Sequence, residues 1–257
     1  MRFDIVLPAH NEEHRIDPTL RALRAGFTDP ETRFLVALDA CTDDTAAIVR
    51  GHAQEDPRVD LYEYPKLGKG GVVLETFRDS DAELVGFVDA DGATPPAELH
   101  RLVAAARDAD GAIASRRHPA AVLPAPRSAG RRLTSLGFAH GVKRLFGLPY
   151  GDTQCGAKVF RREAMARLLC EVRSTDLLFD VELLLAARRL GLHVAEVPTI
   201  WLDQAGSRVS AMADSPRMGA SLARLWLRHR EEPGTAHRVE PRAAPRRELP
   251  PEADVAA

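Results

Sequence analysis

Short apolar runs alternate with helix-like patterns along the first 115 residues of the chain. Residues 16–27, for example, carry apolar side chains at helical spacing. Between such segments lie five runs with the length and composition of buried strands: 3–8, 34–38, 59–64, 84–88 and 111–115. Strands and helices that alternate at this pace predict an α/β fold, in which a mostly parallel sheet carries helices on both faces.

The second half of the chain continues the pattern with a strand, two helices and a strand pair, at 157–160, 163–169, 177–190 and 193–202. We therefore expect one domain over residues 1–230. From residue 231 onward the chain has five prolines, mixed charges and almost no large apolar side chain. This composition cannot bury enough surface to offset the ordering entropy, so it predicts a disordered tail over 231–257.

A basic amphipathic helix is predicted at the end of the domain, over residues 217–230. Its large apolar side chains share one face, and its arginines fall mostly on the opposite face. Such a helix can lie on an anionic membrane. Packing against its own domain is the more ordinary use of the pattern, and the sequence leaves both readings open.

Polar and charged side chains follow directly after several of the predicted strands. They are residues 11–13, Asp39, residues 66–69, and the pair Asp89 and Asp91. In open α/β sheets, ligands bind beyond the carboxyl ends of the strands. We therefore expect these groups to converge on one edge of the sheet and to form a binding site there.

Asp89 and Asp91 close a buried strand with two carboxylates one residue apart. Such a pair repels itself unless a cation lies between its members. The spacing suits oxygen ligation of Mg²⁺ or Mn²⁺, with a substrate phosphate supplying further ligands. The alternative is that the pair caps the helix that starts near Pro95. The convergence of polar groups on the same edge favours the metal interpretation.

The overall composition narrows the class of protein without identifying a partner. The chain has 257 residues, 45% of them hydrophobic, and a formal net charge of -2, which makes no case for nucleic-acid binding. Three cysteines without CxxC spacing indicate neither a disulfide framework nor a zinc site. No secretory signal or membrane-spanning run is visible. We expect a cytoplasmic protein whose membrane contact, if any, is peripheral and at the inner face.

One stretch departs from this balance of charge. Residues 111–151 contain no Asp or Glu, yet they carry seven Lys and Arg side chains. Cations without counter-charges repel one another, so an anionic ligand explains the stretch more easily than a plain solvated surface does. A solvated basic loop is the alternative.

Several segments together resemble the GT-A fold glycosyltransferases of family 2. The segments are, in chain order, 6–13, Asp39, 88–92, 151–160, 179–182 and 201–207. The last three are similar to segments of the dolichyl-phosphate β-glucosyltransferases and their bacterial polyprenyl-phosphate relatives. The resemblance runs from residue 3 to about residue 210 and implies a GT-A fold, the fold of nucleotide-diphospho-sugar transferases.

The resemblance also implies which residues hold the nucleotide-sugar donor. Those that would line the nucleoside pocket, hold the base or ribose, or lie near the sugar nucleotide are Pro8, Ala9, Glu12, Asp39 and Lys69. The family usually has Asp-Asp-Gly-Ser where this chain has Asp-Ala-Cys-Thr at 39–42. The nucleobase therefore stays open between a UDP-hexose and a GDP-hexose.

By the same resemblance, Asp89 and Asp91 would bind the metal that bridges the donor diphosphate. Arg116 and Arg131, with Arg127 close behind, would hold the phosphate of a lipid acceptor. Such an acceptor is already ionised and needs no strong base. It needs fixed arginines instead, because one anion must be held against another.

A hydroxyl acceptor would set a different requirement, because a base must take its proton. Asp180, with Glu182 beside it, is the candidate. At the start of a predicted helix, however, Asp180 could equally be the N-cap of that helix.

The sequence thus predicts an inverting, metal-dependent glycosyltransferase that moves a hexose from a nucleotide sugar to a polyprenyl phosphate of the dolichyl type. Inversion is implied by the resemblance alone. Two alternatives stay open. One is a family 2 glycosyltransferase with a soluble hydroxyl acceptor, and the other is a nucleotide-sugar-binding protein that has lost catalysis.

Overall fold

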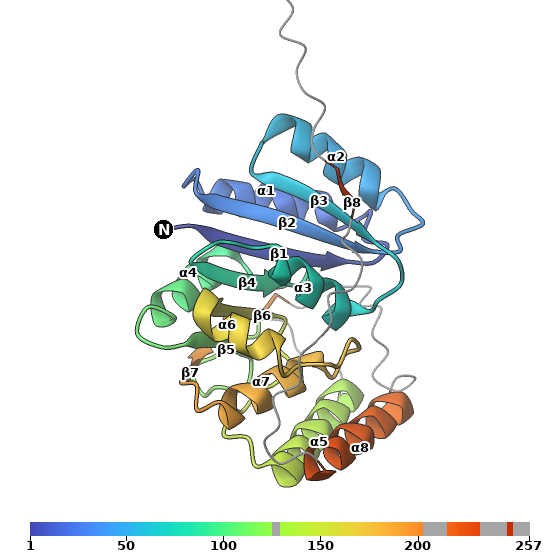
Figure 1. Ribbon diagram of the computed structural model, residues 1–257, viewed down its shortest axis with the longest axis vertical. Coiled ribbons are helices and arrows are strands. Elements are labelled where there is room, and N and C mark those ends of the chain that lie inside the picture. Colours follow the sequence, from blue (N-terminus) through green and yellow to red (C-terminus); the bar gives the residue numbers. More distant parts are fainter. Residues whose placement is uncertain (125–128, 203–214, 232–245, 249–257) are drawn as a thin grey trace, which may run out of the picture.

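The computed structural model of the chain describes residues 1–124, 129–202, 215–231 and 246–248 (Figure 1). Within its helices and strands, this description leaves out the side chains of 129–134, 215–218, 230–231 and 246–248. A central sheet carries helices on both faces, which confirms the predicted α/β architecture (Figure 1).

The sheet has eight strands in the described part of the chain, in the spatial order β7-β5-β6-β4-β1-β2-β3-β8. The strands are β1 Phe3–Ala9, β2 Thr32–Asp39, β3 Val59–Tyr64, β4 Leu84–Val88, β5 Gly111–Ser115, β6 Ala157–Arg161, β7 Val194–Pro198 and β8 Arg246–Glu248. Strand β1 is parallel to β2 and β4, and β2 is parallel to β3. Strand β5 is parallel to β7. By contrast, β6 runs antiparallel to β4 and β5, and β8 runs antiparallel to β3.

Helices cover both faces of this sheet. They are α1 Ile16–Gly26, α2 Thr45–Glu55, α3 Lys69–Arg78, α4 Pro96–Ala105, α5 Ala129–Phe146, α6 Arg162–Leu169, α7 Phe179–Arg189 and α8 Ser215–Glu231. One face carries α1, α2 and α4, and the other carries α3, α6 and α7 (Figure 1). The helices α5 and α8 lie side by side (Figure 1).

The hydrophobic core consists of two layers, one on each face of the sheet. Along β1, Ile5 and Leu7 pack in the layer beneath α1, α2 and α4, whereas Val6 packs in the layer beneath α3 and α7. All three side chains are fully buried. A strand covered on both faces has no solvent side, which explains why the strands appear in the sequence as nearly continuous apolar runs.

The five strands predicted in the first 115 residues are confirmed, with bounds within two residues of those expected. The main element that the sequence pattern missed is α5, which lies inside the basic stretch. Phe138, Val142 and Phe146 pack on the core, but Leu136 and Leu145 are exposed, so the apolar residues of α5 are not confined to its core-facing side. Such a helix lacks the periodic signal that identifies an amphipathic one.

The predicted helix near the end of the domain is confirmed as α8. Leu222 and Leu225 are buried in the core layer shared with α7, so this part of the helix packs on its own domain. Membrane contact by its basic face stays a prediction. None of the helices that the structure describes is both long enough and apolar enough to span a bilayer.

The segment 231–257, expected to be a disordered tail, falls mostly outside the described residues. Residue 231 ends α8, and the three residues of β8 pair with β3. The prediction of a domain over 1–230 followed by a disordered tail remains an expectation for the rest of the segment.

The carboxyl ends of β1, β2 and β4 lie together at one edge of the sheet, because these strands are parallel and adjacent. Directly beyond β1 and β2, Asn11 and Ala40 adopt left-handed backbone conformations, with φ of 58° and 50°. The Oδ1 atom of Asn11 accepts a hydrogen bond from the N–H of Thr42 at 2.7 Å and so joins the two loops. Left-handed residues other than glycine concentrate at functional sites, where surrounding contacts hold them in place.

Candidate active site

Asp89 and Asp91 lie directly after β4, at the edge where β1 and β2 also end. The backbone N–H of Asp89 donates to Gly156 O at 2.9 Å, and Asp91 Oδ1 accepts a hydrogen bond from Ala93 N–H at 3.0 Å. The next helix, α4, begins at Pro96 and receives no side-chain cap. The helix-cap interpretation of the two carboxylates is therefore wrong.

The residues at this point fit a divalent metal ion. Burial, together with the charge of Asp89, raises the pKa of the Asp91 carboxyl above its ordinary value. A cation at the site would relieve both effects, and carboxylate oxygens are ligands that Mg²⁺ and Mn²⁺ prefer. In the described ranges no group of three or more His, Cys, Asp or Glu gathers as a metal site. Asp89 and Asp91 stay the predicted metal ligands among the described residues.

Lys69, the first residue of α3, places its ammonium group between two carboxylates. Its Nζ atom lies 2.8 Å from Asp89 Oδ1 and 3.3 Å from Asp180 Oδ2. Burial by itself would lower the pKa of Lys69, but the charges of Asp180 and Asp89 raise the pKa overall. Lys69 is therefore a charged group in contact with one of the two predicted metal ligands.

Asp180, the candidate base, is buried in the first turn of α7 and faces two lysines. Its Oδ1 atom lies 2.5 Å from Lys158 Nζ, and its Oδ2 atom faces Lys69. Burial acts to raise the pKa of Asp180, but the two ammonium groups outweigh it and lower the pKa. A carboxylate in this position is a weak proton acceptor.

The N-cap interpretation of Asp180 is wrong. The helix α7 begins at Phe179, one residue earlier, and has no side-chain cap. The oxygens of Asp180 instead face the ammonium groups of Lys158 and Lys69. The neighbouring carboxylate, Glu182, accepts hydrogen bonds from the backbone N–H groups of residues 173 and 174, so it holds the loop before α7.

Gly156 allows Asp89 to lie close to the start of β6. A Cβ atom at position 156 would lie 1.8 Å from Asp89 Oδ2 and 2.2 Å from the carboxyl carbon of the same residue. No side chain fits in this space while Asp89 keeps its contact with Lys69. Asp89 can therefore occupy this position only because residue 156 is a glycine.

The residues predicted to line the nucleoside pocket lie at the ends of β1 and β2. Pro8 and Ala9 are the last two residues of β1, and Ala9 is buried. Glu12 follows in the loop and forms a two-point ion pair with Arg15, with N–O distances of 2.6 Å and 2.7 Å. The structure thus brings these residues to the same edge as Asp89, and their contact with a nucleoside stays a prediction.

Asp39, the last residue of β2, fixes the loop that leads into α3. Its Oδ1 atom accepts hydrogen bonds from Leu67 N–H at 2.7 Å and Gly68 N–H at 3.1 Å, and its Oδ2 atom pairs with Lys66 at 2.8 Å. Asp39 therefore connects the end of β2 to the start of α3, where Lys69 lies. Its predicted contact with the base or ribose is untested.

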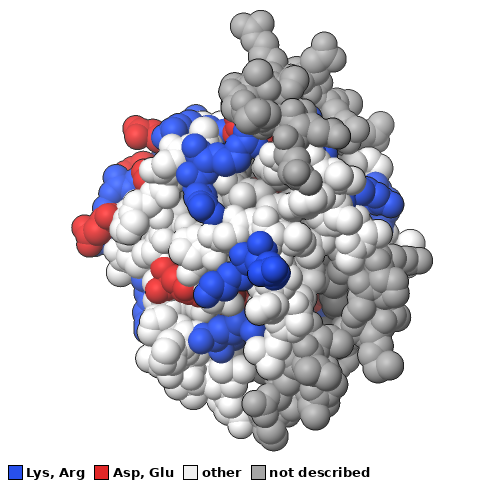
Figure 2. Space-filling view, turned by 90° about the horizontal axis from the view of Figure 1, so that it is seen from below, with Lys and Arg blue, Asp and Glu red and all other residues white. Residues whose placement is uncertain are grey.

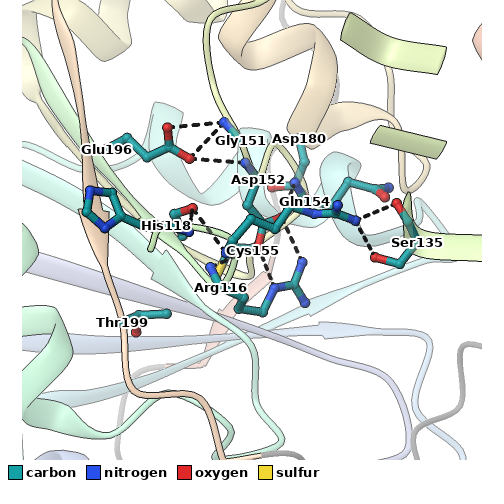
Figure 3. Close-up of polar contacts among 12 residues, drawn as sticks. Arg116, His118, Ser135, Gly151, Asp152, Gln154, Cys155, Asp180, Glu196 and Thr199 are labelled. Carbon is teal, nitrogen blue, oxygen red and sulfur yellow. Dashed lines mark hydrogen bonds and ion pairs between the residues drawn. The ribbon is translucent and has the colours of Figure 1, made fainter. Parts of the chain in front are cut away.

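Arg116 directly follows β5 and is held by the buried carboxylate of Asp152 (Figure 3). The Nε atom donates to Asp152 Oδ2 at 2.6 Å and Nη2 donates to Oδ1 at 2.9 Å. The guanidinium also lies over the ring of Trp201, 4.8 Å from its centre. Although burial opposes it, the Arg116 charge lowers the pKa of Asp152 to about 2. Arg116 is thus a fixed cation rather than a mobile surface side chain.

Further contacts join the basic stretch to the loop before β6. Glu196 on β7 accepts hydrogen bonds from Gly151 N–H at 2.9 Å and Asp152 N–H at 3.1 Å (Figure 3). Arg117 donates to Ser135 Oγ on α5 at 2.6 Å. The interpretation of the whole stretch as a solvated loop is therefore wrong, because part of it is helical and two of its arginines are held by partners.

The other two predicted acceptor-binding arginines are not placed. Arg127 and the side chain of Arg131, which lies on α5, fall outside the described residues. Their role stays a prediction. On the face of the molecule in Figure 2, Lys and Arg side chains occupy more of the visible surface than Asp and Glu side chains do.

Comparison with known proteins identifies the family. Residues 4–169 match the model of glycosyl transferase family 2. A dolichyl-phosphate β-glucosyltransferase from Trichomonas vaginalis is 34% identical over 244 residues, which cover 86% of this chain and 70% of that protein. The chain therefore belongs to glycosyltransferase family 2, a family of enzymes that take their sugar from a nucleotide sugar.

Other relatives share this level of identity but differ in length. Glycosyltransferase AglD from Haloferax volcanii is 33% identical over 243 residues, and the match covers 91% of this chain but 38% of that protein. An undecaprenyl-phosphate mannosyltransferase from Micrococcus luteus is 31% identical over 210 residues, covering 79% of this chain and 85% of that protein.

Solved structures with low sequence identity share the fold. Glucosyl-3-phosphoglycerate synthase from Mycobacterium tuberculosis, solved with Mn²⁺, UDP-glucose and phosphoglyceric acid, gives a TM-score of 0.65 at 18% identity and covers 88% of this chain and 79% of that chain. TarS from S. aureus gives 0.59 at 18% identity, covering 88% of this chain and 64% of that chain. These similarities confirm the predicted GT-A fold.

Sequence reasoning missed three residues that hold the site together, namely Asp152, Gly156 and Lys158. All three lie in the segment 151–160, whose family resemblance by itself assigns no role to these positions. The roles depend on contacts with residues far away in the chain, such as Arg116 and Asp89. The resemblance of the segment is the signal that could have led to them.

We expect Gly156→Ala to lower the rate of sugar transfer about a hundredfold, because the added Cβ forces Asp89 away from its position. The measurement is steady-state kinetics with the donor varied. Gly51→Ala in α2 is the matched control, because its added Cβ meets no atom within 4 Å. Equal activity of the two variants would contradict the assigned role of Gly156.

We also expect an acid-dependent contribution of Asp152 to stability. The folded pKa of about 2 lies below the ordinary value of 3.8, so the folded state binds fewer protons than the unfolded state. The contribution is therefore fully present above about pH 4 and is lost as the pH falls towards 2. It amounts to about 2 kcal/mol.

Urea unfolding of the wild type and Asp152→Asn between pH 2 and pH 6 measures this contribution. The difference in the free energy of unfolding between the two proteins should shrink as the pH falls. Asp81→Asn, at an exposed ion pair on the opposite edge of the sheet, provides the comparison. A wild-type advantage that is independent of pH would show that the Asp152 carboxylate does not stabilise the fold through its charge.

Proposed function

We propose that this glycosyltransferase moves a hexose from a nucleoside-diphosphate sugar to a polyprenyl phosphate. The choice of acceptor rests on the surroundings of the Asp180 carboxylate. Both of its oxygens face ammonium groups, which lower its pKa and make it a weak base. A hydroxyl acceptor needs a base to take its proton, whereas a phosphate acceptor is already ionised.

The donor side of the proposal is supported by the edge formed by β1, β2 and β4. The diphosphate of the donor would lie beyond β4, where Lys69 supplies a positive charge and Asp89 and Asp91 would hold the metal. When bound there, Mg²⁺ or Mn²⁺ would stabilise the charge that develops on the departing diphosphate. The nucleoside would lie beyond β1 and β2, beside Glu12 and Asp39.

The reaction would be a single displacement at the anomeric carbon of the hexose. An oxygen of the acceptor phosphate forms the new bond to this carbon, and the bond from the carbon to the nucleoside diphosphate breaks. The electron pair leaves with the diphosphate, and no proton has to be removed from the acceptor. Such a displacement inverts the anomeric configuration.

The protein would contribute mainly by holding two anions in line with each other. Arg116 supports this role because Asp152 and Trp201 fix its guanidinium near the end of β5. Arg131 on α5 is the second arginine that we propose for the acceptor phosphate. The relatives from Trichomonas and Micrococcus, whose names specify dolichyl and undecaprenyl phosphates, support an acceptor of this class.

The test is transfer from radiolabelled UDP- and GDP-hexoses to added polyprenyl phosphate in the presence of Mn²⁺. We expect labelled product that extracts into organic solvent, and we expect Asp91→Ala to reduce its formation about a hundredfold or more. Asp81→Ala is the control, because this exposed aspartate lies at the other end of the sheet and pairs with Arg2.

Two results would contradict the proposal in different ways. Labelled product that stays in the aqueous phase, formed with a hydroxyl compound, would move the assignment to a soluble acceptor. Donor binding without turnover for any acceptor would favour the catalytically inactive binding protein. Full activity of Asp91→Ala would remove this residue from the metal site.

A further inference from the structure

Lys158 is a fully buried lysine that none of the proposed chemistry uses directly. It lies on β6, opposite Phe87 of β4, and its side chain is 0% exposed. Its Nζ atom contacts two oxygens, donating to Cys155 O at 2.7 Å and pairing with Asp180 Oδ1. A charged side chain at this depth needs an explanation, because a buried ion pair is often no more stabilising than a well-packed apolar pair.

The surroundings of Lys158 form a row of alternating charges that ends at the predicted metal site. From the core outward, the row consists of Lys158, Asp180, Lys69 and Asp89, joined by ion pairs of 2.5 Å, 3.3 Å and 2.8 Å. The ammonium groups of both lysines also lie 5.3 Å from the centre of the Phe87 ring. The row thus connects β6, α7, α3 and the end of β4.

The position of Lys69 depends on how strongly Asp180 attracts it. In the structure Lys69 lies nearer to Asp89 than to Asp180, at 2.8 Å against 3.3 Å. Lys158 already neutralises one oxygen of Asp180. Without Lys158, the buried Asp180 would have Lys69 as its remaining ammonium partner in this row and would draw it away from Asp89.

The backbone around Lys69 is held in place by its close packing against α7. Gly68 before it has a φ of +82°, and a Cβ on Gly70 after it would meet Phe179 at 2.4 Å, so the first turn of α3 sits tightly against α7. The start of α3 is therefore fixed, and the side chain of Lys69 is the part that responds to Asp180.

We propose that Lys158 is a positioning residue for donor binding, which acts through Asp180 to hold the Lys69 ammonium at Asp89, where the donor diphosphate and its metal would bind. Lys158 itself does not touch the donor. The inference rests on the donor side of the proposed function and is independent of which acceptor the enzyme uses.

A double-mutant cycle with Lys69→Met and Lys158→Met tests the proposal, with the affinity for UDP or GDP in the presence of Mn²⁺ measured by isothermal titration calorimetry. We expect each single variant to weaken binding about tenfold, the size typical of one charge-assisted contact. If Lys158 acts through Lys69, the double variant binds no more weakly than Lys69→Met alone.

Two results would overturn the proposal. One is wild-type affinity in Lys158→Met, and the other is a double variant that is weaker by the product of both effects, about a hundredfold. A merely structural role of Lys158 predicts that second result, or a loss of thermal stability without a change in affinity. Lys158→Arg, which keeps the charge, should bind more tightly than Lys158→Met.

A second pair of variants keeps the test valid if Lys158→Met does not fold. Asp180→Asn removes the same link with an isosteric side chain, and it should likewise have no effect in the Lys69→Met background. Asp4→Asn is the matched control, because Asp4 is also fully buried and ion-paired, with Arg33, but lies on β1 far from the site. It should lower the melting temperature and leave nucleotide affinity unchanged.

Failure of the proposed role of Lys158 is distinguishable from failure of the proposed function. Calorimetry measures donor binding alone, so an enzyme that fails to use polyprenyl phosphate would still give the expected cycle. Conversely, an additive cycle would leave transfer to polyprenyl phosphate standing and would remove only the role of Lys158.

Discussion

The ion pair between Lys69 and Asp89 is the contact on which the candidate site depends. It places a cation beside a carboxylate at the end of a buried strand, and it is held from behind by Asp180 and Lys158. Charges of alternating sign allow the four ionised side chains to lie close together, although Lys158 and Asp180 are buried, where either of them alone would be strongly disfavoured. In the proposed function, the metal ion and the donor diphosphate would bind at the Asp89 end of this row.

The fold explains how these residues meet. Parallel strands deliver their carboxyl ends to one edge, so β1, β2 and β4 bring Glu12, Asp39 and Asp89 together although they are far apart in sequence. The antiparallel strand β6 lies beside β4 and brings in Lys158, and Gly156 directly precedes β6. One half of the site thus follows from the parallel strands, and the other half depends on β6, which runs antiparallel to β4.

The parallel half could be predicted from the sequence, because buried strands are continuous apolar runs and a polar residue after each run marks its end. The other half could not. Lys158 sits inside a strand, where a lysine is usually a solvent-facing residue, and its burial depends on Asp180 from a distant helix. The sequence allowed two roles for Asp180, a general base or a helix N-cap. Only the contacts of its carboxylate oxygens in the folded protein distinguish these roles. The sequence pattern did not predict α5, because exposed leucines on this helix obscure the apolar stripe that packs on the core.

The central claim is that this edge binds a nucleoside diphosphate together with a divalent metal held by Asp89 and Asp91. Isothermal titration of the wild-type protein with UDP and with GDP, once in Mn²⁺ and once in EDTA, tests it most directly. The account predicts that one of the two nucleotides binds in Mn²⁺ and that its affinity falls at least about tenfold in EDTA, since the carboxylates then repel the diphosphate without a bridging cation. Equal affinity in the two buffers would contradict it.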